Sequence, residues 1–309
     1  MNAAEIAAAL GDERRDGRDW KCRCPCCNGR LSLRDGDHGR PVWHCWGTCN
    51  WRDVARELRR LGYLSGEQPA PLPPEEIKRR KAAEERKRRA DIANARDLWD
   101  QARPIKDTLG DHYLRVVRGL DVLSPYIREA ETRALRYLPR AWHSPGIYRP
   151  AIAAAIEHVE HGFIGCHITY LAVGGSGKTT LDPPRKVFGG CKGGAVRLGT
   201  PRPGEWLAIA EGLESTLSVA VACAMPAWAA LSAGGIRSLV LPSEFNAVLI
   251  CADNDANGIG QAAARDAAAR FIAERRRCCI AIPRGAKDFN DVLTGRAAAA
   301  IEEARHVAA

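Results

Sequence analysis

The chain has 309 residues, enough for two or three domains, and its 46% hydrophobic content is ordinary for a globular protein. It shows no signal peptide and no long apolar run, which excludes a membrane-spanning protein, and we expect it in the cytoplasm. Its 46 basic residues outnumber 37 acidic ones, so the net charge is +9 and a polyanionic partner is favoured.

The first predicted domain, residues 1–65, contains two closely spaced cysteine pairs. Cys24 and Cys27 lie in one short turn, and Cys45 and Cys49 lie in another. Two such turns can present four thiolates tetrahedrally, so the spacing predicts one structural zinc ion. Because intracellular chains rarely form disulfides, the cysteine content also favours metal binding here. Three neighbouring side chains leave the ligand set open: Cys22, Cys26 and His44.

Tryptophans crowd the same segment. It holds half of the 8 in the chain, namely Trp20, Trp43, Trp46 and Trp51. Single-stranded nucleic acids stack on such rings beside basic side chains, but a small ribbon also needs rings to fill its core. We therefore expect some of these rings to be buried and others exposed, and we choose Trp46 as the ring that contacts DNA.

A proline-rich break and a charged helix are predicted to link the first domain to the rest, over residues 66–97. The break lies at Pro69–Pro74, and the pattern of Glu75–Trp99 predicts a helix with supporting charge pairs such as Glu85 with Arg89. This helix is either a solvated linker or a contact for the phosphate backbone of DNA.

Residues 98–200 are predicted to form a mixed α/β subdomain. The apolar segment Phe163–Val173 indicates a strand that is half of a hairpin. The following Gly174–Thr180 is similar to a phosphate-binding P-loop, but Ala172 occupies the first glycine position and prolines stop a helix soon afterwards. We interpret this glycine-rich segment as a hairpin turn.

The next predicted domain, residues 201–298, repeats a short apolar strand followed by a helix. We predict strands at Leu207–Ala210, Val248–Ala252 and Cys278–Ile282, and helices at Ser215–Ala224 and Ile259–Arg275. Repeated β-α units indicate a mostly parallel sheet with right-handed crossovers. The remaining residues, 299–309, are expected to form a C-terminal helix or tail.

Acidic side chains follow each of these three strands. They are Glu211, then Asp253 and Asp255, then Asp288 and Asp291. A single acidic turn is readily explained as a solvated turn or a helix cap, but the carboxyl ends of parallel strands meet at one edge of a sheet. Crowded carboxylates raise one another's pKa unless a cation lies between them, so the pattern predicts a Mg²⁺ site, which Mn²⁺ can also fill.

The acidic motifs resemble a known domain. Glu211-Gly, Asp253-x-Asp-x-x-Gly and Lys287-Asp-x-x-Asp resemble the Toprim domain of bacterial-type primases, topoisomerases and some nucleases. With Leu231-Ser-Ala-Gly-Gly, they are most similar to the primase-like Toprim proteins of phages and plasmids. The resemblance implies a Rossmann-like sheet flanked by helices.

The resemblance also implies roles for the acidic side chains. Asp253, Asp255 and Asp288 would hold Mg²⁺, and Glu211 would be a general acid/base or a metal contact. The family pattern varies in spacing at Asp291, which leaves the role of that residue open.

The cysteine turns are similar to the zinc ribbon of bacterial primases, although Cys27 stands where that pattern has histidine. In those primases, basic residues of the subdomain before the Toprim domain hold template and nucleotides. For this chain, the resemblance and the charge together suggest Arg118, Arg185 and Lys186, and Lys287 beside the acidic motif.

The sequence therefore predicts a DNA primase that makes RNA primers on single-stranded DNA from nucleoside triphosphates. A replicative helicase and the nucleoid are its expected surroundings, on a chromosome, phage or plasmid. A Toprim nuclease and a non-catalytic zinc-containing DNA-binding replication accessory are the alternatives. A type IA topoisomerase would need a tyrosine after the Toprim domain, and all 6 tyrosines precede it.

Overall fold

The computed structural model describes residues 1–36, 40–47, 49–64, 73–120, 134–256, 258–295 and 300–301. The chain divides into two compact units, Met1–Ile77 and Lys78–Ala309. Most of the proline-rich break expected at Pro69–Pro74, and most of the tail expected at 299–309, lie outside the described residues. In the described part of the chain, no helix combines the length and the apolar composition that a membrane span requires.

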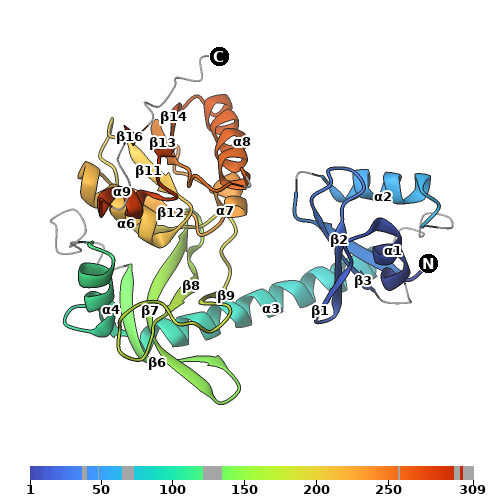
Figure 1. Ribbon diagram of the computed structural model, residues 1–309, viewed down its shortest axis with the longest axis horizontal. Coiled ribbons are helices and arrows are strands. Elements are labelled where there is room, and N and C mark those ends of the chain that lie inside the picture. The colour runs from blue at the N-terminus through green and yellow to red at the C-terminus, as the bar shows by residue number, and fades with distance from the viewer. Residues whose placement is uncertain are drawn as a thin grey trace. The chain divides into compact units, whose positions relative to one another are not determined.

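The first unit is a four-stranded antiparallel sheet with two helices (Figure 1). Its elements in chain order are α1 (Ala3–Leu10), β1 (Arg14–Asp16), β2 (Asp19–Arg23), β3 (Arg30–Asp35), β4 (Pro41–Cys45) and α2 (Trp51–Arg60). Because side chains alternate along a strand, Cys22, Leu31 and Leu33 face one side and pack with Ile6 of α1. Lys21, Arg23 and Arg30 consequently face the other side.

A long charged helix, α3 (Pro74–Asp100), follows, close to the predicted Glu75–Trp99. Exposed ion pairs line it, including Glu85 with Arg89 at 2.8 Å. Its last turns are not solvated, because Ala95 and Trp99 are buried in a core that they share with strands of the second unit. The end of this helix is therefore part of a folded domain rather than of a linker.

The second unit begins with a five-stranded antiparallel sheet in the order β5-β6-β7-β8-β9. These strands are β5 (Arg103–Pro104), β6 (Leu135–Ser144), β7 (Ile147–His158), β8 (Gly162–Tyr170) and β9 (Arg185–Gly189). Between β5 and β6 lie the short helix α4 (Leu109–His112) and a π-helical turn, η2 (Tyr113–Val117). A β-bridge between Leu171 and Lys178 closes the glycine-rich segment, which confirms that it is a hairpin turn and not a P-loop.

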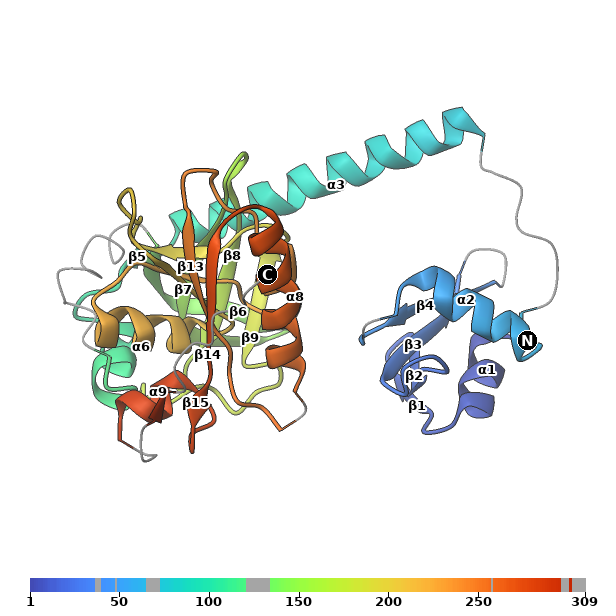
Figure 2. The same cartoon turned by 90° about the horizontal axis from the view of Figure 1, so that it is seen from above.

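The second sheet has the order β10-β12-β11-β13-β14 and is parallel except for β10. Its strands are β10 (Val196–Leu198), β11 (Leu207–Ala210), β12 (Ala227–Ala229), β13 (Ala247–Cys251) and β14 (Arg277–Ala281). Figures 1 and 2 show α6 (Leu213–Cys223) and α8 (Ile259–Ala273) on opposite faces of this sheet. The predicted Rossmann-like architecture is confirmed.

Four smaller elements complete this domain. They are α7 (Ala233–Ser238), β15 (Pro283–Arg284), α9 (Phe289–Leu293) and β16 (Ala300–Ile301). The central strands have apolar side chains on both faces, as expected for a parallel sheet covered by helices on both sides. In β11, Ala208 and Ala210 face α6, while Leu207 and Ile209 face the α8 side.

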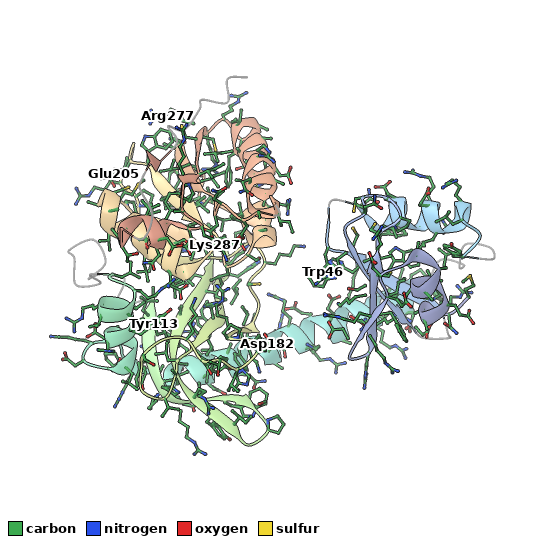
Figure 3. All side chains as sticks on the ribbon, in the orientation of Figure 1. Trp46, Tyr113, Asp182, Glu205, Arg277 and Lys287 are labelled. Carbon is green, nitrogen blue, oxygen red and sulfur yellow. The ribbon has the colours of Figure 1, made fainter. Side chains whose placement is uncertain are left out.

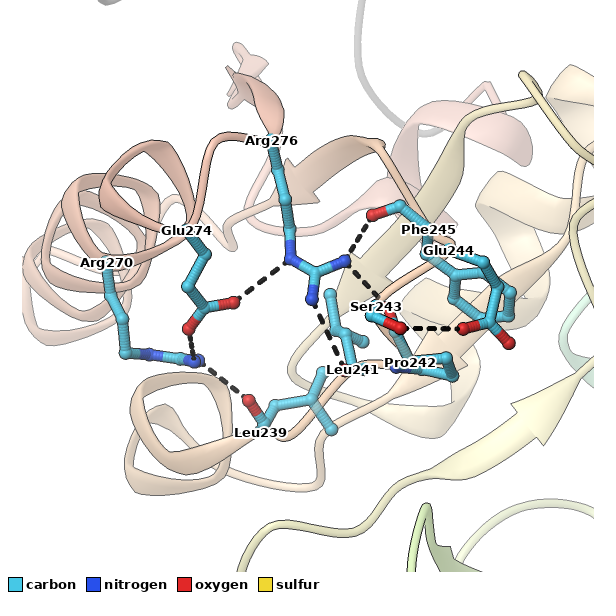
Figure 4. Close-up of polar contacts among 9 residues, drawn as sticks. All are labelled: Leu239, Leu241, Pro242, Ser243, Glu244, Phe245, Arg270, Glu274 and Arg276. Atoms are coloured by element: carbon cyan, nitrogen blue, oxygen red, sulfur yellow. Dashed lines mark hydrogen bonds and ion pairs between the residues drawn. The ribbon is translucent and has the colours of Figure 1, made fainter.

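A buried arginine fastens the loop before β13 to the start of β14 (Figure 4). The guanidinium of Arg276 donates to the carbonyls of Pro242 at 2.8 Å, Leu241 at 3.3 Å and Phe245, and pairs with Glu274 at 3.0 Å. These contacts satisfy carbonyl groups that no strand or helix pairs. They fasten the loop before β13, the strand that Asp253 follows, to the residue before β14.

Candidate functional site

The carboxylate side chains leave neighbouring strands at the same level. Glu211 directly follows β11, and Asp253 follows β13 by one residue. These strands pair in parallel with Ala210 opposite Cys251, so both side chains emerge at one edge. This is the edge at which open α/β sheets bind ligands.

Burial and mutual repulsion raise the pKa values of these two acids. The pKa of Asp253 rises to about 6, chiefly because the group is buried, and further because Asp288, Glu211 and Asp255 lie nearby. Burial and Asp255 raise the pKa of Glu211, while Arg185 and the backbone amide of Ala233 oppose that rise. Oxygen ligands whose ionised forms are disfavoured in this way suit a divalent cation such as Mg²⁺.

The first turn of α6 orients the central aspartate. The hydroxyl of Ser215 donates to Asp253 Oδ1 at 3.0 Å. Gly260, in the first turn of α8, lies close to Glu211, since a β-carbon there would lie 3.6 Å from Glu211 Oε2. At the rim, Lys287 Nζ lies 3.7 Å from Asp255 Oδ1 and is largely exposed, so Lys287 lies at the acidic edge as the motif suggested.

The last acidic pair is partly engaged in a helix cap. Asp288 is the N-cap of α9 and accepts a hydrogen bond from the backbone of Asp291 at 2.9 Å. Among the described residues, no three of the acidic side chains bring their oxygens within 4.8 Å of one another. Mg²⁺ commonly binds through one or two carboxylates and several waters, so a looser arrangement also suits it.

The structure adds a buried glutamate that the sequence did not single out. Glu214 is 5% exposed and pairs with Lys178 Nζ at 2.7 Å, while the hydroxyl of Tyr113 donates to it at 3.1 Å. Burial by itself would raise the pKa of Glu214, but Lys178 reverses the effect and lowers it to about 2. In Figure 3, Tyr113 of η2 lies in the subdomain that contains the β5–β9 sheet, and Lys287 lies above it in the Toprim segment.

The sequence carries a weak signal for this group. Glu214 is in the first turn of a helix, which usually indicates a solvated acid near the helix dipole. Lys178 is in the turn that imitates a P-loop. Lys178 and Glu214 lie far apart in the sequence, so no local pattern could have indicated that they form a pair.

Two of the three basic residues suggested in the preceding subdomain lie near acidic side chains of the Toprim segment. Arg185 acts electrostatically on Glu211, and Arg118 acts on Glu214. The backbone of Arg118 is also bound to the segment that contains Asp288 and Asp291. Its carbonyl accepts a hydrogen bond from the buried side-chain amide of Asn290 at 2.8 Å. Lys186 does not join them: it is on the other face of β9, over the ring of Trp142 at 5.0 Å.

The four cysteines chosen from the sequence come together in the first unit. Cys24 Sγ lies 4.0 Å from Cys49 Sγ, Cys27 Sγ lies 3.6 Å from Cys45 Sγ, and all four sulfurs lie within 4.8 Å of one another. Thiolates around one zinc ion at about 2.3 Å would lie about 3.8 Å apart, so the four side chains fit zinc.

The three side chains that the sequence left open lie outside this group. Cys22 is buried against α1, and burial together with Cys24 raises the pKa of its thiol to about 11. Cys26 is exposed, and His44 packs edge-on against Trp46.

The tryptophans of the first unit divide as expected. Trp46 and Trp51 are 59% and 63% exposed, whereas Trp20 and Trp43 pack against the core. Lys21 Nζ lies 5.3 Å from the Trp46 ring centroid. An exposed ring beside a cation is the pair of groups that single-stranded nucleic acids stack on and bind.

One further group carries metal-binding side chains, on the turn between β7 and β8: His158, Glu160 and His161. The two imidazole rings stack at 4.6 Å with an 18° angle between their planes, so their in-plane lone pairs run side by side and do not converge. His158 Nδ1 also accepts the backbone N–H of Glu160 at 3.1 Å. This geometry is that of a packed turn and not of a formed metal site.

Two segments match protein-family models. Residues 206–299 match the Toprim domain, and residues 89–198 match a domain of unknown function, DUF7146. No curated protein matches the chain.

Solved primase structures are similar at low levels. The zinc-binding and RNA polymerase domains of the Aquifex aeolicus primase give a TM-score of 0.41 at 12% identity, covering 97% of this chain and 84% of that one. A primase domain from Pseudomonas aeruginosa gives 0.45 at 14% identity, covering 67% and 75%, and the E. coli primase catalytic core gives 0.41 at 15%, covering 63% and 72%. With their parallel sheet and acidic strand ends, residues 206–299 therefore form a Toprim domain, in a chain whose first unit carries four cysteines that fit a zinc ribbon.

Proposed function

We propose that this protein is a DNA primase, a nucleotidyltransferase that makes short RNA primers on single-stranded DNA. One observation carries the proposal: the acidic edge with Glu211 and Asp253 lies near a cation of the preceding subdomain, Arg185, within one folded unit. Carboxylates opposite cations can hold metal ions and a triphosphate together, as nucleotidyl transfer requires.

Each side chain has a role in this reaction. Asp253, Asp255 and Asp288 would hold Mg²⁺, which when bound neutralises charge on the attacked phosphate and on the leaving pyrophosphate. Arg185 would contact the phosphates of the incoming nucleotide, and Ser215 keeps Asp253 in one orientation. Glu211 has a raised pKa and could accept the proton of the attacking 3′-hydroxyl, which would make it a general base.

The first unit would bind the template. Trp46 offers an exposed ring beside Lys21, and the four cysteines would keep the sheet folded around one zinc ion. We extend the proposal to replication of a chromosome, phage or plasmid, in the cytoplasm at the nucleoid and with a replicative helicase as partner. This extension depends on the primase activity.

Primer synthesis is the direct test. Purified protein with single-stranded DNA, labelled ribonucleotides and Mg²⁺ or Mn²⁺ should yield short RNA, and Asp253→Asn or Glu211→Gln should reduce the yield at least about 100-fold. Asp266→Asn is the matched control, because Asp266 is an exposed carboxylate on α8 that pairs with Arg237.

The same reactions separate the alternatives. Degradation of the DNA without RNA synthesis would identify a nuclease that uses the same carboxylates. Binding of DNA with neither reaction would identify an accessory protein. Primer synthesis that persists in both carboxylate variants would contradict the assigned site.

A further inference from the structure

The sheet of the first unit has an open cavity on its basic face. The cavity has a volume of about 420 Å³, within the range of about 300–1,000 Å³ that is usual for small-molecule sites. Four cationic side chains line it, contributed by β1, β2 and β3: Arg14, Lys21, Arg23 and Arg30. One carboxylate, that of Asp12, lines it as well.

These cations are placed where they repel one another. Arg14 is directly opposite Lys21 in the β1–β2 pair, and Arg23 is directly opposite Arg30 in the β2–β3 pair. Like charges directly opposite each other destabilise an antiparallel sheet. Two such pairs, side by side around one cavity, therefore cost stability unless an anion lies between them.

Neighbouring carboxylates compensate only part of this charge. Arg23 pairs with Asp12, and Lys21 lies 3.8 Å from Asp16 and from Asp19. Arg14 and Arg30 form no ion pair with any residue that the structure describes. The cavity thus presents an excess of positive charge and hydrogen-bond donors to whatever enters it.

We propose that this cavity binds a triphosphate group. A single nucleic-acid strand carries one charge per nucleotide along a line, whereas a triphosphate concentrates its charge on three adjacent phosphorus atoms. Four cations around one open cavity match the concentrated arrangement, and arginine binds phosphate oxygens in pairs. Free nucleoside triphosphates and RNA with a 5′-triphosphate end carry the same group.

The use of this site rests on the proposed primase function. A primer begins with a nucleotide that keeps its 5′-triphosphate, because each new bond forms at the 3′-hydroxyl. The cavity would then hold the 5′ end of the growing primer in the first unit while the Toprim domain extends its 3′ end. Trp46, whose ring lies next to Lys21, is placed to stack on the first base.

The test compares two RNAs that differ only at the 5′ end. A short RNA labelled at its 3′ end, with either a 5′-triphosphate or a 5′-hydroxyl, is titrated with the full zinc-loaded chain without Mg²⁺, and fluorescence anisotropy gives the dissociation constants. We expect the triphosphate to bind about tenfold more tightly. Arg14→Ala and Arg30→Ala should each remove most of this preference.

Arg59→Ala is the matched control, because it removes one charge from an exposed position on α2 that does not line the cavity. It should keep the preference. Zinc content and circular dichroism establish that each variant is folded. Competition with inorganic tripolyphosphate and with a nucleoside triphosphate shows whether the free group suffices or an RNA end is needed.

Three outcomes decide the matter. Equal affinity of the wild type for the two RNAs overturns the proposal. An Arg30→Ala variant that weakens both RNAs and single-stranded DNA alike also overturns it, because the cavity would then contact the backbone. If the triphosphate preference holds but no primer is made, the site stands and the primase proposal fails.

Discussion

Glu214 and Lys178 form an ion pair of 2.7 Å that joins the first turn of α6 to the turn after β8. The glutamate is almost completely buried, and the hydroxyl of Tyr113 completes its contacts. The pair fixes the start of the helix that follows Glu211 against the preceding sheet. It therefore links the acidic edge of the Toprim domain to the subdomain that supplies Arg185 and Arg118.

Removing Lys178 should destabilise the second unit. Lys178→Met leaves the buried Glu214 carboxylate without its paired cation, which costs about 3–5 kcal/mol. Thermal unfolding followed by circular dichroism should show a clearly lower midpoint than for Lys192→Met, which changes an exposed lysine. The double variant Lys178→Met, Glu214→Leu should recover much of the loss, and no recovery would show that the pair does more than balance charge.

Acid should weaken the same contact. Because the pKa of Glu214 is lowered to about 2 in the folded protein, the contribution of this group to stability is present above the unfolded-state value of about 4.3. It is lost as the pH falls from about 4 to 2. The difference in stability between wild type and Glu214→Gln should shrink over that range, and a constant difference would contradict the assignment.

The effect of Asp253 on folding stability should have the opposite sign to that of Glu214. Its pKa is raised to about 6, so without metal the folded state at pH 7 bears the cost of an ionised, buried group. Asp253→Asn should stabilise the Mg²⁺-free protein at pH 7 by up to about 3 kcal/mol, and the gain should shrink as the pH falls below 6. Added Mg²⁺ should raise the melting temperature of the wild type but not of the variant.

Ser215 should affect Mg²⁺ binding through its hydrogen bond to Asp253. Its hydrogen bond favours the ionised carboxylate, so Ser215→Ala should raise the pKa of Asp253 further. The acid limb of the pH profile of Mg²⁺-dependent activity should then move to higher pH, with about tenfold weaker activation at neutral pH. Ser238→Ala, which removes a serine that donates to the Gly235 carbonyl, should leave the profile in place.

Zinc should be confined to the four central cysteines. Elemental analysis should find about one zinc per chain, and Cys45→Ser or Cys49→Ser should reduce that value and unfold the first unit. Cys26→Ser should retain the metal, because this exposed thiol lies outside the group. Loss of zinc from Cys26→Ser would show that the ligand set is different.

The sequence by itself determined much of the Toprim fold. The strand before Glu211 was predicted residue for residue at Leu207–Ala210, and the strands before Asp253 and Asp288 within one residue at each end. Buried parallel strands are short, apolar and followed by helices, so the local pattern carries the information. The four cysteine ligands were also predictable from local sequence, because metal ligands in tight turns are close in sequence.

Only the tertiary structure decided which charged groups face one another. Arg185 and Lys186 are adjacent in sequence, but side chains of a strand alternate, so one lies near Glu211 and the other lies over Trp142. The Glu214–Lys178 pair and the cations around the cavity of the first unit follow from strand register and from packing between subdomains. Such contacts join residues that no local pattern relates, because burial and long-range pairing are properties of the folded chain.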